Sequence, residues 1–326
     1  MNEIAPHSPG RSGRSVPIIL DTDLDTDCDD AGALAVLHHL ADAGRARILG
    51  VVCDAPAPHA GAAAAALNAH FGRPKLPVAQ CDPSRAAPLV DYLAHRSRCR
   101  PEQLYGDFLG KAFAEKNPFV PEDPVALYRR LLAREEDGGV TICAIGLLGP
   151  LAALLESPPD AHSPLSGREL VSRKVRCLVS MAIAETPRGR DRFNWWMDRP
   201  SADRVLHRWP TPIFIQPHGE QIPTGADFQT TLPAEDPLRI AFERFLGGGG
   251  RSRPSWDQLT VLWAALGEAS GLRVDFEGGL RYHAETGEHE WLEAPIAAPR
   301  MHLGLRDSPR ALTRLVESYM LGVSVT

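Results

Sequence analysis

The 326-residue chain contains no uninterrupted apolar run of about 18 residues, the length that a membrane-spanning helix needs. The first 15 residues are polar and lack the apolar segment of a signal peptide. There is no excess of Lys and Arg to attract nucleic acid, because the formal net charge is −6. We therefore expect no membrane span, no nucleic-acid partner, a disordered tail over residues 1–15 and a cytoplasmic location.

Paired cysteine motifs are also missing. The six cysteines form no CxxC pair, so the sequence indicates neither a zinc site nor a disulfide framework. Several cysteines lie within apolar runs, which favours buried free thiols in a reducing compartment. No glycine-rich phosphate loop and no Gly-x-Ser-x-Gly elbow stands out either. These absences direct attention to the acidic residues.

Strand and helix patterns alternate along the chain. Short apolar runs typical of buried strands occur at residues 15–20, 47–53, 76–79, 140–145, 174–182 and 211–216. Helical spacing occurs at residues 31–41, 61–71, 124–134, 147–155, 234–246 and 256–266. Residues 81–124 are irregular and contain Pro and Gly, so we expect long loops there. The order predicts an α/β fold, with a Rossmann-like, mostly parallel central sheet flanked by helices, in a single domain over residues 16–326.

Six aspartates fall within ten residues, directly after the first predicted strand: Asp21, Asp23, Asp25, Asp27, Asp29 and Asp30. Two carboxylates about 6 Å apart repel by roughly 3 kcal/mol at an effective dielectric constant of about 20. A divalent cation with oxygen ligands, raised pKa values or display to solvent would each relieve this repulsion. Because sites in open α/β sheets form at the carboxyl ends of strands, we predict a calcium-like metal site in this loop.

Three alternatives to this interpretation of the aspartate loop are an EF-hand, a phosphatase loop and an acidic surface loop without a ligand. An EF-hand matches poorly, because Thr26 stands at its glycine position and Gly32 at its bidentate glutamate position. Phosphatases of the haloacid-dehalogenase type also begin with a strand and a DxD motif. They carry Thr or Val where this chain has Asp25, so a DxD-type phosphatase remains an alternative of lower rank.

The segment DTDLDTDCDDAGAL, residues 21–34, resembles the signature of the inosine–uridine-preferring nucleoside hydrolases. It is similar to the longer form of a bacterial branch, DTDxGxDxDDxxAL, except that Asp25 replaces the glycine. Further matches follow in the family's order at residues 68–77, 140–152, 193–200 and 255–257. The resemblance covers roughly residues 16–320 and implies a nucleoside hydrolase-like fold, with a homodimer or homotetramer as the assembly.

The resemblance implies a calcium site made of residues that lie far apart in the sequence. Asp23 would be a Ca²⁺ ligand and the general base that activates a metal-bound water. Asp30 would bind the cation in a bidentate manner, Asp257 would close the site, and Gly149 would supply a backbone carbonyl. The implied reaction is hydrolysis of the N-ribosidic bond of a nucleoside or related riboside to ribose and free base.

The resemblance also implies a set of substrate contacts. Asp29 and Asn194 would hold the ribose hydroxyls, and Asp54 stands near the place of a family asparagine. Trp256 would stack on the leaving base, as in family members that prefer purines. Arg192 aligns with the glutamate that contacts the ribose 5′-hydroxyl. Either Arg192 points to solvent and Asp191 or another group replaces that glutamate, or its guanidinium selects a 5′-phosphate or another anion.

These departures keep a second hypothesis open. The chain could bind a ribosyl ligand without hydrolysing it, because Asp25, Pro150 and Arg192 each differ from the family's pattern. Release of base and ribose, lost in an Asp23→Asn variant, would indicate the enzyme. Binding without turnover would indicate the binding protein.

Overall fold

One ten-stranded sheet runs through the computed structural model, which describes residues 15–82 and 89–323. The predicted disordered tail lies outside the described residues except for Ser15. The strands are β1 (Val16–Thr22), β2 (Ala46–Cys53), β3 (Val78–Gln80), β4 (Val140–Ala144), β5 (Val175–Met181), β6 (Arg188–Arg190), β7 (Ile213–Gln216), β8 (Pro223–Thr224), β9 (Arg253–Pro254), β10 (Leu272–His283), β11 (Glu288–Leu292) and β12 (Arg300–Leu305).

Thirteen α-helices and one 3₁₀ helix are present in the same described ranges. The helices are α1 (Asp29–Asp42), α2 (Ala60–His70), α3 (Val90–Arg98), α4 (Tyr105–Ala114), α5 (Pro124–Arg134), α6 (Gly149–Glu156), α7 (Gly167–Lys174), α8 (Asn194–Met197), α9 (Arg199–Arg208), α10 (Phe228–Thr231), α11 (Pro237–Leu246), α12 (Trp256–Leu266), η1 (Gly267–Ser270) and α13 (Pro309–Leu321). Within the described part of the chain, none of them is long and apolar enough to span a membrane.

The sheet is parallel over most of its width. Its strand order is β3-β2-β1-β4-β5-β7-β12-β10-β11-β6. Every neighbouring pair from β3 to β12 is parallel, and the last three strands are antiparallel to their neighbours. The predicted α/β architecture with a mostly parallel sheet and flanking helices is confirmed.

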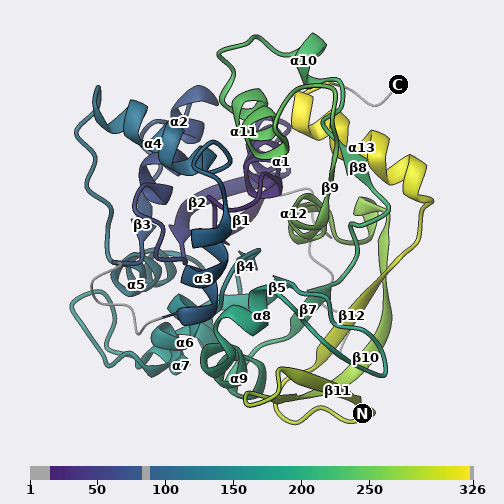
Figure 1. The fold of residues 1–326 in the computed structure, drawn as a ribbon. Coiled ribbons are helices and arrows are strands. Elements are labelled where there is room, and N and C mark those ends of the chain that lie inside the picture. The colour runs from purple at the N-terminus through teal and green to yellow at the C-terminus, as the bar shows by residue number, and fades with distance from the viewer. Residues whose placement is uncertain (1–14, 83–88, 324–326) are drawn as a thin grey trace.

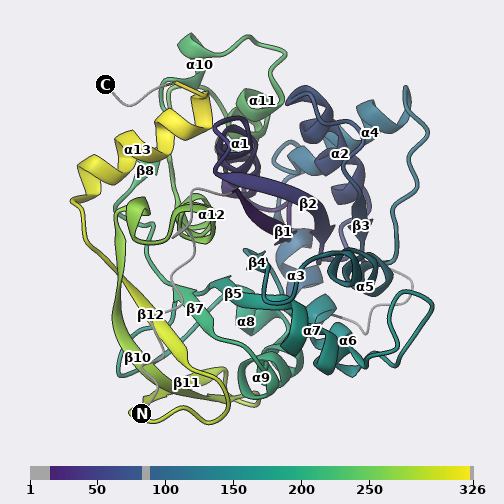
Figure 2. The same ribbon diagram turned by 180° about the vertical axis from the view of Figure 1, so that it is seen from behind.

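Helices cover both faces of this sheet (Figures 1 and 2). Ile18 and Leu20 of β1 point to one face and pack in the core with α1, α2, α11, α12 and α13. Ile19 points to the other face and packs with α5, α6, α7 and α9. Because successive side chains of a strand alternate between faces, a strand covered on both sides has to be apolar throughout. This explains the unbroken apolar run that precedes the aspartates.

The prediction of loops over residues 81–124 is wrong in part, since α3 and α4 lie there. The glycines that suggested loops in this stretch serve close packing of α4. A Cβ on Gly106 would lie 2.8 Å from Asp25 Oδ1, and a Cβ on Gly110 would lie 2.4 Å from the carbonyl oxygen of His59. α3 buries only Tyr92, so it has little of the apolar pattern by which a helix is recognised in a sequence.

Strands β1, β2 and β4 end next to one another, which brings their following loops together. Thr22 pairs with Cys53, and Asp21 pairs with Ala144. The loop after β4 passes so close to the other two that only glycine fits at position 146. A Cβ there would lie 2.3 Å from Asp54 Oδ2 and 2.5 Å from the backbone nitrogen of Asp23.

A Gly146→Ala variant therefore tests this close approach. We expect it to lower the free energy of unfolding by about 1–3 kcal/mol, because the added methyl must displace a buried backbone segment. Urea denaturation measures the change. Gly149→Ala is the matched control, since its Cβ would meet only Asp198 Oδ2 at 3.1 Å, and we expect little change. Equal losses in the two variants would contradict the argument.

Candidate active site

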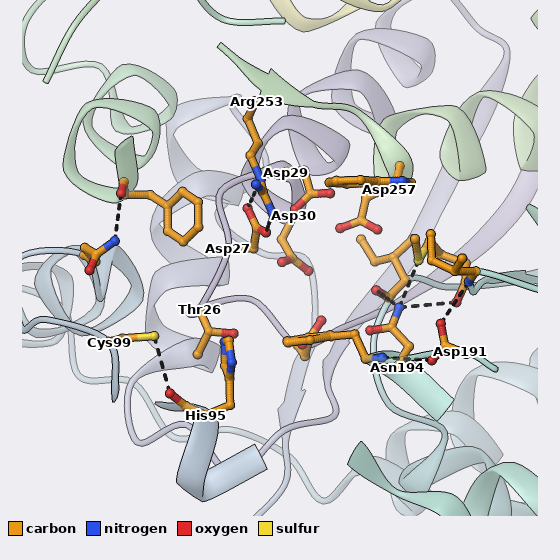
Figure 3. Close-up of a pocket in the computed structure, with 18 of the residues that line it drawn as sticks. Thr26, Asp27, Asp29, Asp30, His95, Cys99, Asp191, Asn194, Arg253 and Asp257 are labelled. Atoms are coloured by element: carbon orange, nitrogen blue, oxygen red, sulfur yellow. Dashed lines mark hydrogen bonds and ion pairs between the residues drawn. The ribbon is translucent and has the colours of Figure 1, made fainter. Parts of the chain in front are cut away.

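A pocket of about 450 Å³ lies at the carboxyl ends of the central parallel strands. Its wall combines the loop after β1 with the first turn of α12 and the start of α8, which are distant in the sequence (Figure 3). The predicted site residues that line it are Asp23, Asp29, Asp30, Asn194, Trp256 and Asp257. The structure thus brings together six of the nine residues that the sequence singled out.

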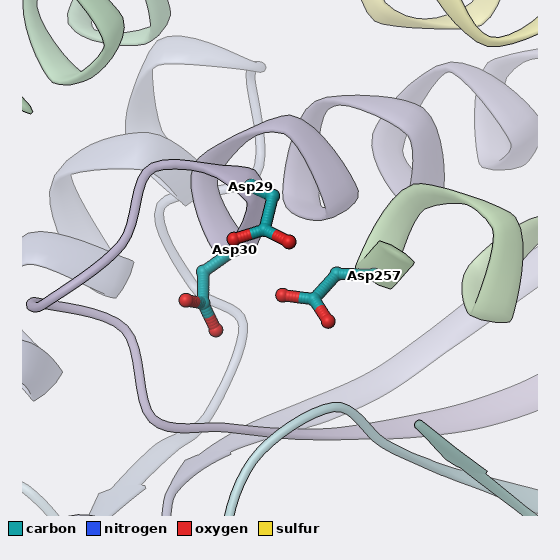
Figure 4. A group of neighbouring side chains, drawn as sticks. All are labelled: Asp29, Asp30 and Asp257. Carbon is teal, nitrogen blue, oxygen red and sulfur yellow. The ribbon is translucent and has the colours of Figure 1, made fainter. Parts of the chain in front are cut away.

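Three buried carboxylates converge at this pocket. Asp29, Asp30 and Asp257 each offer an oxygen, and these oxygens lie within 4.8 Å of one another. Figure 4 shows Asp29 and Asp30 in the first turn of one helix, facing Asp257 from the start of another. Both helix N-termini carry partial positive charge, which favours anions there. This donor set fits a hard divalent cation, which prefers carboxylate oxygens.

The electrostatics of these carboxylates supports the same interpretation. Burial, followed by the charges of neighbouring aspartates, raises the pKa of Asp29, Asp30 and Asp257 well above the usual range. Three carboxylates this close cannot all ionise in a buried site without a compensating cation. The hydroxyl of Thr22 donates a hydrogen bond to Asp30 Oδ1 and fixes that carboxylate.

Asp23 lies on the same pocket, outside the close group of three. It is 5% exposed, and burial raises its pKa to about 7, with smaller contributions from the charges of Asp27, Asp21 and Asp25. After burial, the charge of Asp23 is the largest influence that raises the pKa of Asp30. A carboxyl group with a pKa near neutrality can exchange a proton with water, as a general base requires.

Asn194 is held with its amide nitrogen turned into the protein. Its Nδ2 donates to the carbonyl oxygens of Ile145 at 3.0 Å and Met181 at 3.2 Å, so its Oδ1 remains to accept from a hydroxyl. The turn before α8 is fixed by Asp191, which accepts from the backbone N–H groups of Ile183, Phe193 and Trp195. Asp191 therefore positions Asn194 at the pocket.

An aromatic and cationic wall faces the carboxylates. Trp256 is half-buried and lines the pocket. The Arg253 guanidinium carbon lies 5.1 Å from the centre of the Trp256 ring and 5.4 Å from that of Phe245. Arg253 also pairs with Asp27, donating from Nε to Oδ1 at 2.9 Å. This pairing compensates the charge of Asp27 and leaves an aromatic surface suited to a flat ligand group.

Asp54, Gly149 and Arg192 lie elsewhere. Asp54 and Gly149 line a second pocket of about 770 Å³. Asp54 is 1% exposed, and burial and the facing charge of Asp21 raise its pKa well above the usual range. Gly149 already belongs to α6, whereas Ile145, directly after β4, lines the pocket of the aspartates. Arg192 is exposed and outside the pocket lining, which corresponds to the first of its two interpretations.

Several residues on this pocket were not identified by sequence reasoning. His95, Arg98 and Cys99 come from α3 or directly follow it, in the stretch that was expected to form loops. Gln103 and Phe245 approach from separate segments. Only Arg253 carried a usable signal, since it stands three residues before Trp256 and its charge complements the aspartate loop.

Comparison with known proteins identifies solved structures with a similar fold. No curated protein matches the sequence significantly. Among solved structures, an inosine-uridine preferring nucleoside hydrolase from Bacillus anthracis is 16% identical, with a TM-score of 0.65 over 94% of this chain and 100% of that chain. A plant nucleoside hydrolase, PpNRh1, is 15% identical, with a TM-score of 0.60 over 94% and 99% of the two chains.

A third similar structure is the type III effector protein XopQ complexed with adenosine diphosphate ribose. It is 18% identical, with a TM-score of 0.69 over 97% of this chain and 95% of that chain. The model of the family described as inosine-uridine preferring nucleoside hydrolase matches residues 18–267, which include the aspartate loop, Asn194 and Asp257. The chain therefore belongs to the inosine-uridine preferring nucleoside hydrolase family and is an N-ribohydrolase.

Proposed function

We propose that this N-ribohydrolase depends on Ca²⁺ and acts on a purine nucleoside or a related riboside. The observation that carries the proposal is the convergence of Asp29, Asp30 and Asp257 within 4.8 Å on a pocket that also holds Asn194 and Trp256. The homodimer or homotetramer and the cytoplasmic location expected from the sequence stay predictions.

The cation, when bound, would supply positive charge that keeps the carboxylates ionised and makes a nearby water more acidic. Asp30 and Asp257 would hold it, with Asp29 close enough to share it. Ile145 replaces Gly149 as the proposed source of a backbone carbonyl, because Ile145 lines this pocket. Its carbonyl oxygen has two lone pairs, so it can accept from Asn194 and still face a cation.

Asp23 would take a proton from a water molecule as that water attacks the anomeric carbon of the ribose. The N-ribosidic bond breaks, and the leaving base keeps the bonding electron pair and takes a proton from solvent to give the free base. Positive charge develops on the ribosyl ring, which the surrounding buried carboxylates stabilise. Asn194 Oδ1 would accept from a ribose hydroxyl, and Trp256, backed by Arg253, would stack on the purine.

Removing the carboxylate of Asp23, the proposed general base, should slow hydrolysis while leaving the fold intact. We expect Asp23→Asn to lower kcat by about 10²–10⁴-fold, because proton transfer to a positioned carboxylate contributes that much. Released base and ribose are measured for inosine, adenosine, guanosine and uridine with Ca²⁺ present. Asp307→Asn is the control, since Asp307 pairs with Arg306 and lies outside the lining of the pocket. Full activity of Asp23→Asn would refute the assigned base.

The stabilisation of the protein by Ca²⁺ should increase as pH rises. The pKa of Asp23 is about 7 in the folded metal-free chain, against an ordinary value of 3.8. Between these values the folded state binds the proton more tightly than the unfolded state, so metal-free stability falls as pH rises from about 4 to about 7. A cation replaces the bound protons. We therefore expect Ca²⁺ to raise Tm more at pH 8 than at pH 5, as measured by differential scanning calorimetry.

An Asp257→Asn variant serves as the internal control for this measurement, because it removes the negative charge of one proposed ligand. Its Ca²⁺-dependent rise in Tm should be much smaller at either pH. A rise that is equal at both pH values, or unchanged in Asp257→Asn, would contradict a cation site at this cluster.

A second candidate is a phosphorylated riboside as the ligand of this pocket. Arg98 and His95 line the pocket together with Arg253, and the similar structure of XopQ contains adenosine diphosphate ribose. Arg253 is compensated by Asp27, whereas Arg98 has no ion-pair partner in the described ranges. Arg98 therefore replaces Arg192 as the proposed contact for an anionic group, since guanidinium binds phosphate oxygens well.

This candidate is tested by comparing ligands with and without phosphate. We expect Arg98→Met to weaken the affinity for adenosine diphosphate ribose about tenfold or more, because a hydrogen bond to a charged group contributes about 1.5–3 kcal/mol. Inosine binding should not change. Isothermal titration calorimetry measures both, with Arg192→Met as the matched control outside the pocket. Equal weakening for both ligands, or weakening only in Arg192→Met, would refute the phosphate contact.

A further inference from the structure

Asp25 stands where the family's signature has glycine, and the structure gives it a partner. Its carboxylate is buried, and Oδ2 lies 2.5 Å from Nε of Arg96. Nη2 of the same arginine lies 2.8 Å from Asp107 Oδ2. Arg96 belongs to α3 and Asp107 to α4, so one guanidinium joins the aspartate loop to both helices. Gly106 leaves room for Asp25, since a Cβ there would lie 2.8 Å from Oδ1.

α3 has few other attachments to the protein. Tyr92 is its only buried residue, while Val90 and Leu93 are exposed. An ion pair between Asp91 and Arg199, at 3.0 Å, holds its first turn. Because α3 buries so little apolar surface, the hydrophobic effect contributes little to its docking. The pairing of Arg96 with Asp25 is therefore a major contact that fixes the second half of this helix.

That second half of α3 forms part of the pocket wall. His95, Arg98 and Cys99 line the pocket, and Figure 3 shows His95 and Cys99 beside Thr26 of the aspartate loop. The His95 ring contacts Phe193 edge-on, with 4.9 Å between the ring centres, so α3 reaches from the aspartate loop to the segment that carries Asn194. Asp25 and Arg96 are not themselves in the pocket lining.

We propose that Asp25 is a positioning residue that acts through Arg96 to hold α3 as the ligand-binding wall of the pocket. Asp25 lies outside the group of carboxylates that could hold a metal, and its charge is compensated by Arg96. It therefore controls ligand affinity and not the chemical step. Only the identity of the ligand in this inference rests on the proposed function.

The experiment compares Asp25→Asn, Arg96→Met and the double variant with the full-length parent protein. Hydrogen–deuterium exchange should show amides of residues 90–98 exchanging about tenfold faster or more in each variant, because α3 loses its main anchor. KM should rise about tenfold with kcat within about threefold. The double variant should be no worse than the worse single variant, since both remove the same interaction.

Three controls separate positioning from a general loss of structure. Arg173→Met removes an exposed ion pair with Asp137 and should change neither exchange in α3 nor KM. Arg96→Lys keeps a charge without the planar fork and should restore part of the affinity. Circular dichroism verifies that each variant is folded. If Arg96→Met does not fold, exchange in α3 and KM are measured on Arg96→Lys instead.

Two results would overturn the inference. One is unchanged exchange in α3 together with faster exchange in residues 22–28 and α1, which would make Asp25 a support of its own loop. The other is a lower kcat with an unchanged KM. If the parent protein hydrolyses no nucleoside, the proposed function fails, but exchange in α3 and the Kd for adenosine diphosphate ribose still decide whether Asp25 positions this wall.

Discussion

Repulsion among buried carboxylates is the constraint on which the site depends. Each aspartate of the loop has to be compensated, and the compensating group differs along the loop. Tyr128 donates to Asp21, Arg96 pairs with Asp25 and Arg253 pairs with Asp27. Among the residues that the structure describes, no cationic side chain forms an ion pair with Asp29 or Asp30, and both face Asp257. The loop thus contains two kinds of aspartate. Those with a protein partner organise the structure, and Asp29 and Asp30 belong to a group that could hold a cation.

The geometry of the fold makes this division possible. α1 begins directly after the loop, and α12 packs beside it although it follows more than 200 residues later in the sequence. Both helices direct their N-terminal ends at the pocket, which favours the carboxylates in their first turns. Loops at the carboxyl ends of parallel strands add Asp23, Ile145 and the segment before α8. The site is therefore held mostly by regular elements, with the aspartate loop enclosed among them.

Much of this arrangement could be predicted from the sequence, because its signals are local. The apolar run before the aspartates indicated a doubly covered strand, and the resemblance linked Asp30 to Asp257 and placed Asn194 and Trp256 at one site. Non-local contacts could not be read in the same way. Nothing near Asp25 in the sequence indicates Arg96, and the glycines of α4 suggest loops until their packing is known. Gly149 was chosen by a motif, whereas the position of the chain after β4 favours Ile145.

The substitution of Asp25 for glycine bears differently on the two functional hypotheses once its partner is known. From the sequence it counted against hydrolysis, because it departs from the family's pattern. The structure pairs that charge with Arg96, a member of α3, and removes it from the group around Asp30. The same helix carries His95 and Arg98 into the pocket. The substitution thus leaves the cluster of Asp29, Asp30 and Asp257 in place, and the proposed consequence of Asp25 concerns ligand binding at the wall that carries Arg98.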